Sequence, residues 1–160
     1  MNRRKFLTAT GLGVVTLPAA WSRPLRAANS AFEVTRSKAE WKDMLSPLEY
    51  AVMREEDTEP PFTSPLNNVK EEGTFLCRGC DLPLYSSDDK FDSGTGWPSF
   101  TRALPDAVET KPDRKLLLFV RTECHCRRCG SHLGHIFDDG PEPTGKRHCI
   151  NGVSLTFRPV

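Results

Sequence analysis

The chain is 160 residues long, with 22 basic side chains against 21 acidic ones, and 38% of its residues are hydrophobic. This length fits one domain with its own core and is too short for two full domains. The first 28 residues hold five basic side chains and no acidic one, so the other 132 carry 17 basic and 21 acidic side chains, a net charge of −4. Such a mildly acidic body lacks the basic surface expected of a protein that binds nucleic acid or anionic lipid.

The first 28 residues have the pattern of an export signal. Arg3 and Arg4 precede an apolar stretch at residues 6–21, and Ala27 and Ala28 offer small residues for cleavage. Adjacent arginines are typical of the twin-arginine type of signal. A membrane anchor, the alternative, needs about 20 uninterrupted apolar residues. We therefore expect a cleaved signal over residues 1–28, a functional domain over residues 29–160 with no membrane span, and a periplasmic or other extracytoplasmic location in a bacterium.

Two helices and a set of strands are expected after the signal. Ser37 with Glu40, and Ser46 with Glu49, form two capping boxes, which predict short helices over residues 37–45 and 46–55. After residue 65, short apolar runs alternate with Gly, Pro, Asp and Ser clusters, which is typical of a small antiparallel β domain. These runs are residues 74–77, 82–85, 116–122 and 153–157. The last alternates strictly, as a half-buried strand does.

Four of the six cysteines form two C-x-x-C pairs. The pairs are Cys77 with Cys80 and, after 45 intervening residues, Cys126 with Cys129. Two tight turns of this kind can point four thiolates at one ion, the tetrahedral arrangement of a structural zinc site. In an exported protein, disulfides are the alternative. Structural disulfides seldom come as paired C-x-x-C turns, and a protein exported already folded can load metal beforehand, so the pattern favours zinc.

Cys149 lies apart from these pairs, shortly before the run at residues 153–157. If that strand extends back, Arg147, Cys149 and Asn151 project from one face, because alternate residues of a strand share a face. A guanidinium beside a thiol favours the reactive thiolate, and the Asn151 amide could orient a ligand. The alternative is a buried, inert cysteine at the start of a strand.

Two further segments carry side chains with chemical potential. His132 and His135 could move protons in a pocket, bind metal, or form two imidazoles on a surface turn. Trp97 follows Gly94 and Gly96 in a loop, where its indole either covers a small core or forms one wall of an aromatic pocket. Spacing alone leaves these alternatives open.

Together the motifs resemble the B-class methionine sulfoxide reductases, over about residues 37–157. Besides the cysteine pairs, the resemblance rests on Arg54-Glu55, Thr58-Glu59, FDSGTGWPSF at 91–100, Arg121-Thr122-Glu123, HLGHIF at 132–137, DGP at 139–141 and RHCIN at 147–151. It implies a mainly β fold of the Mss4-like or β-tent type, with two antiparallel sheets, short N-terminal helices and a structural zinc site. The implied reaction is thiol-dependent reduction of the R-epimer of methionine sulfoxide, peptide-bound or free, in protein repair.

The resemblance also implies catalytic roles. Cys149 would be the nucleophile that becomes a sulfenic acid. Arg147 would favour its ionisation, and Asp139 would hold that arginine in place. His132 and His135 would polarise or protonate the departing oxygen.

Binding roles follow from the same resemblance. Trp97 would contact the ε-methyl group of the substrate, and Asn151 would help to orient it. The four paired cysteines would bind zinc, and their removal should unfold the protein. The implied partners are oxidised proteins and an external thiol reductant such as a thioredoxin-like protein, and we expect a monomer that binds no nucleic acid.

This sequence departs from the family pattern in the loop before Trp97. Many members have a second, resolving cysteine where this chain has Thr95, so the sulfenic acid on Cys149 must meet another thiol. One hypothesis is that Cys124 resolves Cys149 as an intramolecular disulfide. The favoured one is that Cys124 packs beside a metal ligand while an external thiol reduces Cys149. His148 stands where tyrosine or phenylalanine is common; it should face away from Cys149, and no role is assigned to it.

Two other functional classes fit part of the pattern. A zinc-knuckle binding module explains the four paired cysteines and leaves Cys149 and the His132–Phe137 segment unused. A dithiol–disulfide oxidoreductase would use one C-x-x-C pair and would hold no zinc. Metal content and turnover of methionine sulfoxide discriminate among the three.

Overall fold

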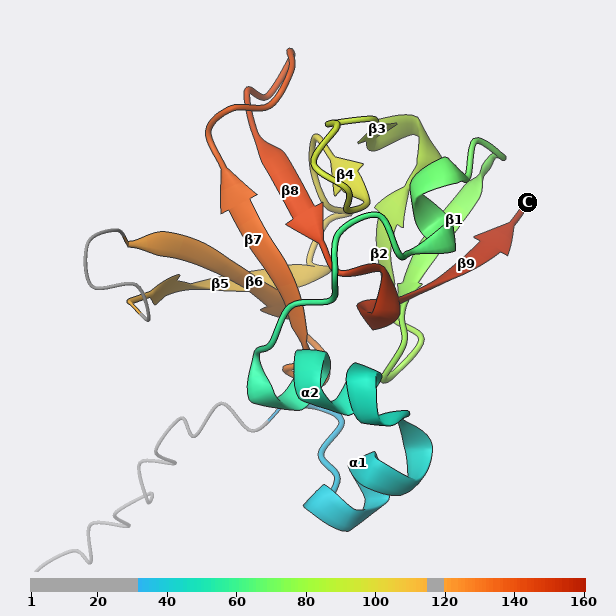
Figure 1. The fold of residues 1–160 in the computed structure, drawn as a ribbon, viewed down its shortest axis with the longest axis vertical. Helices are drawn as coiled ribbons and strands as arrows, with labels where there is room; N and C mark the ends of the chain where they lie inside the picture. Colours follow the sequence, from blue (N-terminus) through green and yellow to red (C-terminus); the bar gives the residue numbers. More distant parts are fainter. Residues whose placement is uncertain (1–31, 115–119) are drawn as a thin grey trace, which may run out of the picture.

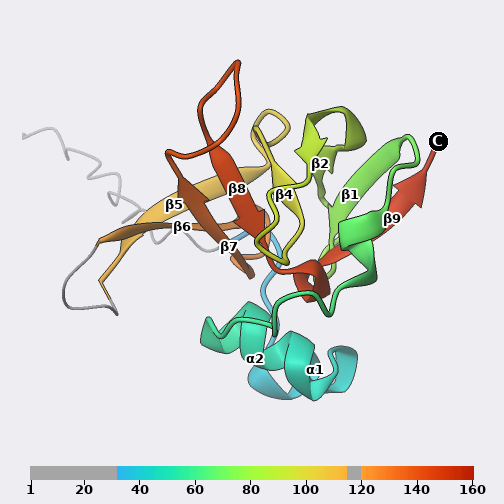
Figure 2. The same ribbon diagram turned by 45° about the horizontal axis from the view of Figure 1, so that its top comes forward.

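The structure is a computed structural model that describes residues 32–114 and 120–160. The predicted export signal, and residues 116–119 of the run predicted as a strand at 116–122, lie outside the described residues. Within the described ranges, the chain forms two α-helices and nine short strands, arranged in two antiparallel sheets (Figures 1 and 2). None of the helices in these ranges has the length and apolar character needed to cross a membrane.

The two helices are α1 (Lys38–Met44) and α2 (Pro47–Glu55), which agree with the prediction to within a residue. Both predicted capping boxes are formed: the side chains of Ser37 and Ser46 accept hydrogen bonds from the backbone of the third helical residue. The helices lie together at one end of the β layers (Figure 2). Each therefore begins where its sequence signal places it.

The smaller sheet has three strands in the order β2-β1-β9. Its strands are β1 (Gly73–Cys77), β2 (Pro83–Ser86) and β9 (Leu155–Pro159). The first two match the predicted runs at 74–77 and 82–85. The last strand of the chain thus pairs with the first one, which closes the fold around a common core.

The larger sheet has six strands in the order β3-β4-β8-β7-β6-β5. Its strands are β3 (Lys90–Phe91), β4 (Ser99–Phe100), β5 (Val108–Asp113), β6 (Arg121–Cys126), β7 (His132–Phe137) and β8 (Arg147–Ile150). The four longest follow one another along the chain as an antiparallel meander (Figure 1). The HLGHIF motif forms β7, and most of the RHCIN motif lies on β8.

The prediction of one continuous strand over residues 153–157 is wrong at its start. Gly152–Ser154 forms a 3₁₀ turn, and β9 begins at Leu155. The cause is the buried carboxylate of Glu59, which accepts hydrogen bonds from the backbone N–H groups of Gly152 (2.5 Å) and Val153 (3.0 Å). Cys149 therefore lies on β8 in the larger sheet and not on an extension of the terminal strand.

The core joins the two sheets through aromatic rings. Phe75 of β1 packs against Phe100 of β4 with ring centroids 4.9 Å apart, and Tyr85 of β2 stacks on Phe100 at 4.3 Å. All three side chains are fully buried. Burial of each large ring stabilises the fold by about 2 kcal/mol or more. Because Phe100 also belongs to the strand beside β8, this cluster fixes the position of Cys149.

Candidate active site and metal centre

One row of side chains crosses the larger sheet at the level of Cys149. The directly paired residues are Lys111 on β5, Glu123 on β6, His135 on β7, Cys149 on β8 and Ser99 on β4. Residues that pair directly across an antiparallel sheet project from the same face. The sheet therefore places the thiol between an imidazole and a hydroxyl.

A cavity of about 120 Å³ opens over this row. Its lining consists of Thr58, Trp97, Arg121, Gly134, His135, Phe137, Cys149 and Asn151. Four of the predicted site residues thus come together in one place although they are spread over 55 positions of the chain. His132, Arg147 and Asp139 are absent from this lining, and they contact residues close to it.

The Cys149 thiol is half-buried, and burial raises its pKa above the ordinary value of 9.0. The Arg147 guanidinium and a hydrogen bond from the Thr95 side chain act in the opposite direction. Burial outweighs both contributions, although Arg147 favours ionisation of the thiol as the sequence predicted.

Arg147 is held beside Cys149 by two contacts. Its Nε and Nη2 donate to the two carboxylate oxygens of Asp139 at 2.8 and 2.9 Å, and its Cζ lies 4.4 Å above the Phe137 ring. The hydrogen bond from Arg147 lowers the pKa of Asp139. A guanidinium fixed in two ways near a thiol can stabilise negative charge that develops there.

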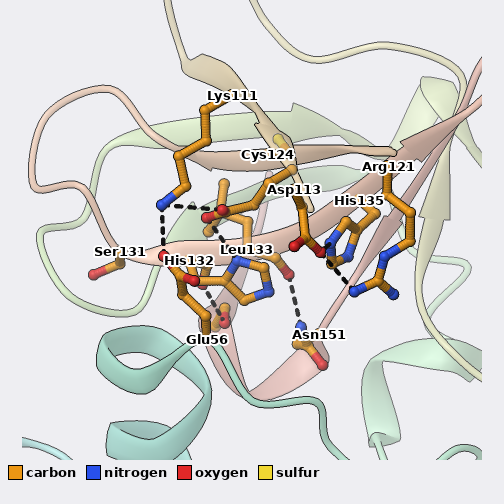
Figure 3. A network of polar contacts seen from close by, with 12 residues as sticks. Glu56, Lys111, Asp113, Arg121, Cys124, Ser131, His132, Leu133, His135 and Asn151 are labelled. Atoms are coloured by element: carbon orange, nitrogen blue, oxygen red, sulfur yellow. Dashed lines mark hydrogen bonds and ion pairs between the residues drawn. The ribbon is translucent and has the colours of Figure 1, made fainter. Parts of the chain in front are cut away.

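The two histidines lie on β7, so the surface-turn alternative is wrong. His132 is buried, with Nδ1 2.9 Å from Glu123 Oε1, and His135 Nε2 lies 2.9 Å from Asp113 Oδ2 (Figure 3). The ring centroids are 5.5 Å apart. Burial, and secondarily the charge of Arg121, lowers the pKa of His135, so this imidazole is neutral at neutral pH.

Trp97 and Asn151 are both tied to residue 59. Trp97 Nε1 donates to the carbonyl oxygen of Glu59 at 3.0 Å, which fixes the indole at the cavity wall. Asn151 Oδ1 accepts from the Glu59 N–H at 3.0 Å, and its Nδ2 donates to the Leu133 carbonyl oxygen at 3.0 Å (Figure 3). Asn151 thus connects β7 to the segment that holds Glu59, besides lining the cavity.

The four paired cysteines converge on one point. Their sulfurs all lie within 4.8 Å of one another, with 3.6 Å between Cys77 and Cys129 and between Cys80 and Cys126. Zinc–sulfur bonds of about 2.3 Å hold tetrahedral sulfurs about 3.8 Å apart, so the set fits a metal ion. All six cysteines are free thiols, and the disulfide alternative is not formed. Because one pair follows β1 and the other joins β6 to β7, a bound metal would link the two sheets.

Cys124 is fully buried on β6. Its sulfur lies 3.5 Å from the Tyr85 hydroxyl, which in turn lies 3.3 Å from Nδ1 of the buried His148. Burial raises the pKa of Cys124 to about 12 and lowers that of His148 to about 4. Both groups are therefore uncharged parts of the core at neutral pH.

Residues 45–159 match the SelR domain family. The chain belongs to the SelR family. It is 48% identical over 128 residues to the peptide methionine sulfoxide reductase MsrB of Agrobacterium fabrum, covering 80% of this chain and 95% of that protein. It is 52% identical over 126 residues to the protein of the same name from Methanosarcina barkeri, covering 78% of this chain and 88% of the relative.

A solved structure titled "Crystal Structure of Mis18 'Yippee-like' Domain" matches with a TM-score of 0.46 and 17% identity, covering 56% of this SelR chain and 98% of that one.

Sequence reasoning missed several contacts of this SelR site. Asp113 lies in no recognised motif, and only the register of β5 with β6 brings it to His135. Thr95 stands where many family members have a cysteine, and its hydroxyl contacts Cys149. Glu59 belongs to the Thr58-Glu59 motif, and its buried carboxylate binds the backbone at residues 152 and 153. The only sequence feature that could have indicated this role is an acidic side chain followed by two prolines.

Proposed function

We propose that this SelR protein reduces methionine R-sulfoxide, in oxidised proteins or free, at Cys149. Reduction of peptide methionine sulfoxide is the activity for which its relatives are named. The observation that carries the assignment to Cys149 is that its thiol opens into a cavity shared with His135 and Trp97.

Substrate binding uses the apolar and polar walls of the cavity in different ways. The face of Trp97, fixed by its hydrogen bond to Glu59, recognises the ε-methyl group. The sulfoxide oxygen then points toward His135, which pairs across the sheet with Cys149. Asn151 keeps the walls together and offers its remaining amide hydrogen to the ligand. His132, hydrogen-bonded to Glu123, supports His135 through ring contact.

The chemical step transfers oxygen from the substrate to Cys149. As the thiol proton leaves, the sulfur attacks the sulfoxide, the sulfur–oxygen bond of the substrate breaks, and Cys149 becomes a sulfenic acid while the sulfoxide becomes a thioether. The proton finishes on the transferred oxygen. Arg147, held by Asp139, and Thr95 stabilise the negative charge that develops on the sulfur.

An external thiol regenerates the enzyme. Thr95 offers no sulfur, and Cys124 is buried against Tyr85 on the opposite face of the sheet from Cys149. A reductant thiol therefore attacks the sulfenic acid directly, releasing water and forming a mixed disulfide, and a second thiol frees Cys149. We infer that a dithiol protein of the thioredoxin-like class supplies both thiols.

We also infer that zinc occupies the four-cysteine site, as a structural ion rather than a catalytic one. Four thiolates complete the tetrahedral shell and leave no open position for substrate. The twin-arginine-type pattern at residues 1–28 supports export of the folded, metal-loaded protein and an extracytoplasmic location.

The test is turnover of separated R- and S-epimers of a methionine sulfoxide peptide with dithiothreitol. We expect turnover of the R-epimer alone, lost in Cys149→Ser with metal content and folding retained. Failure of the wild-type protein to turn over either epimer, while folded and metal-loaded, would remove the proposed reaction. Turnover that persists in Cys149→Ser would remove the proposed nucleophile.

A further inference from the structure

The imidazole of His135 lies beside the carboxylate of Asp113. Asp113 is the last residue of β5, is 7% exposed, and places Oδ2 2.9 Å from His135 Nε2 (Figure 3). The same oxygen lies 2.6 Å from Arg121 Nη2. Because His135 lines the cavity beside Cys149, Asp113 is one residue removed from the reacting thiol.

The position of Asp113 is fixed by the sheet. Asp113 pairs directly with Arg121 across β5 and β6, and the ion pair forms between these cross-strand neighbours. Such a pair holds its carboxylate in one orientation without relying on a long flexible side chain. The geometry is that of an imidazole oriented by a third group, as in general acid–base sites.

The chemistry of the contact selects one protonation pattern of the imidazole. An ionised carboxylate only accepts hydrogen bonds, so Nε2 of His135 carries the hydrogen. In the neutral ring, Nδ1 is then the basic nitrogen. Gain of a second proton creates a positive ring that the adjacent carboxylate stabilises.

We propose that Asp113 is a positioning residue of the reductase, which keeps Nε2 of His135 protonated so that Nδ1 receives the Cys149 proton and passes it to the departing oxygen. This inference rests on the proposed function. The overall reaction is unchanged: thiol and sulfoxide become sulfenic acid and thioether. His135 is neutral before the step and neutral after it. Asp113 touches neither substrate nor thiol.

The proposal fixes the direction in which kcat/KM changes with pH. The charged or titratable groups around His135 are Asp113, Arg121, Glu123, His132 and Cys149. Asp113 raises the pKa of His135, against the effects of burial and Arg121. His135 must be neutral to accept the proton, so kcat/KM falls as pH drops through the pKa of His135. Removing the Asp113 charge lowers that pKa and moves the acid limb to lower pH.

The first experiment compares Asp113→Asn with wild type, using metal-loaded protein and R-sulfoxide peptide. We expect kcat to fall about 10²-fold with little change in KM, and the acid limb to move to lower pH. In a His135→Ala background the Asp113→Asn change should add no further loss, because the two act as a unit. Asp89→Asn is the matched control, since Asp89 also pairs with an arginine, Arg102 at 2.9 Å, outside the cavity lining.

The second experiment needs no variant of Asp113. Nitrogen-15 NMR of the wild-type protein reports which nitrogen of each of its four histidines carries hydrogen, and His135→Gln assigns the signal. We expect hydrogen on Nε2 of His135. Hydrogen on Nδ1, an unmoved acid limb in folded Asp113→Asn, or a full additional loss in the His135→Ala background would each overturn the proposal. Absence of wild-type turnover would instead count against the proposed function, and the NMR result would still test the tautomer.

Discussion

Cys124 and Cys149 lie two strands apart in the larger sheet, and their side chains project from opposite faces of it. Cys149 shares its face with His135 and Glu123, the residues paired across β7 and β6, and Cys124 is the next residue after Glu123. Alternation along the strand therefore sends the Cys124 thiol into the core, where it contacts Tyr85. A bond between the two sulfurs would require the sheet to be broken.

The oxidised protein should therefore contain no Cys124–Cys149 disulfide. Treatment with R-sulfoxide in the absence of reductant should leave Cys149 as a sulfenic acid or its trapped adduct, which peptide mass spectrometry identifies. Cys124→Ala should retain turnover with dithiothreitol and lose about 1–2 kcal/mol of unfolding free energy, because it leaves a small cavity in the core. A stoichiometric Cys124–Cys149 link in the wild type would contradict this expectation.

Thr95→Val should make Cys149 harder to ionise. The variant keeps the branched shape of the side chain and removes the hydroxyl that lowers the pKa of Cys149. A hydrogen bond to a charged group contributes about 1.5 kcal/mol, so its loss should raise the pKa of Cys149. The rate of iodoacetamide labelling of Cys149, followed against pH on the Cys149 peptide, should move to higher pH. Thr95→Ser is the control and should titrate as wild type does; equal curves for valine and threonine would count against the hydrogen bond.

Local signals in the sequence predicted the helices and the metal site well. The capping boxes at Ser37 and Ser46 need only contacts within four residues, and the helices begin there. The two C-x-x-C pairs are also local, since each turn positions its own two sulfurs. Only the approach of the two pairs to each other depends on the fold. It could still be predicted, because four thiolates are the usual ligands of one structural zinc ion.

Long-range contacts account for what the sequence did not reveal. Asp113 reaches His135 only through the register of three strands, and nothing near Asp113 in the chain indicates it. The start of β9 at Leu155 is set by the carboxylate of Glu59, almost 100 positions away in the sequence. Burial raises the pKa of Cys149 and depends on the whole fold, whereas the lowering effect of Arg147 could be predicted from its place in the sequence.

Removal of the metal should unfold the protein and not merely reduce its rate of turnover. The two cysteine turns belong to different sheets, so a bound ion would join β1 to the β6–β7 turn. In such sites the folding free energy is coupled to metal binding. We expect one zinc per chain by metal analysis, and loss of the cooperative thermal transition after chelation or in Cys80→Ser. Cys124→Ser, which also replaces a cysteine, should keep its zinc. A metal-free protein with an unchanged transition would contradict the structural role.

Asn151→Ala should destabilise the fold and also weaken substrate binding. The change leaves the buried N–H of Glu59 without its acceptor, at a cost of about 2 kcal/mol of unfolding free energy. The carbonyl of Glu59 holds the Trp97 indole, so movement of this segment should also raise KM for the R-sulfoxide peptide.

Denaturant unfolding and steady-state kinetics of Asn151→Ala separate two roles of this amide. If Asn151 acted only by orienting the substrate, KM would rise while the unfolding free energy stayed at the wild-type value. The contacts with Glu59 and Leu133 instead predict that both quantities change together. Asn68→Ala, at an exposed asparagine, is the control and should change neither.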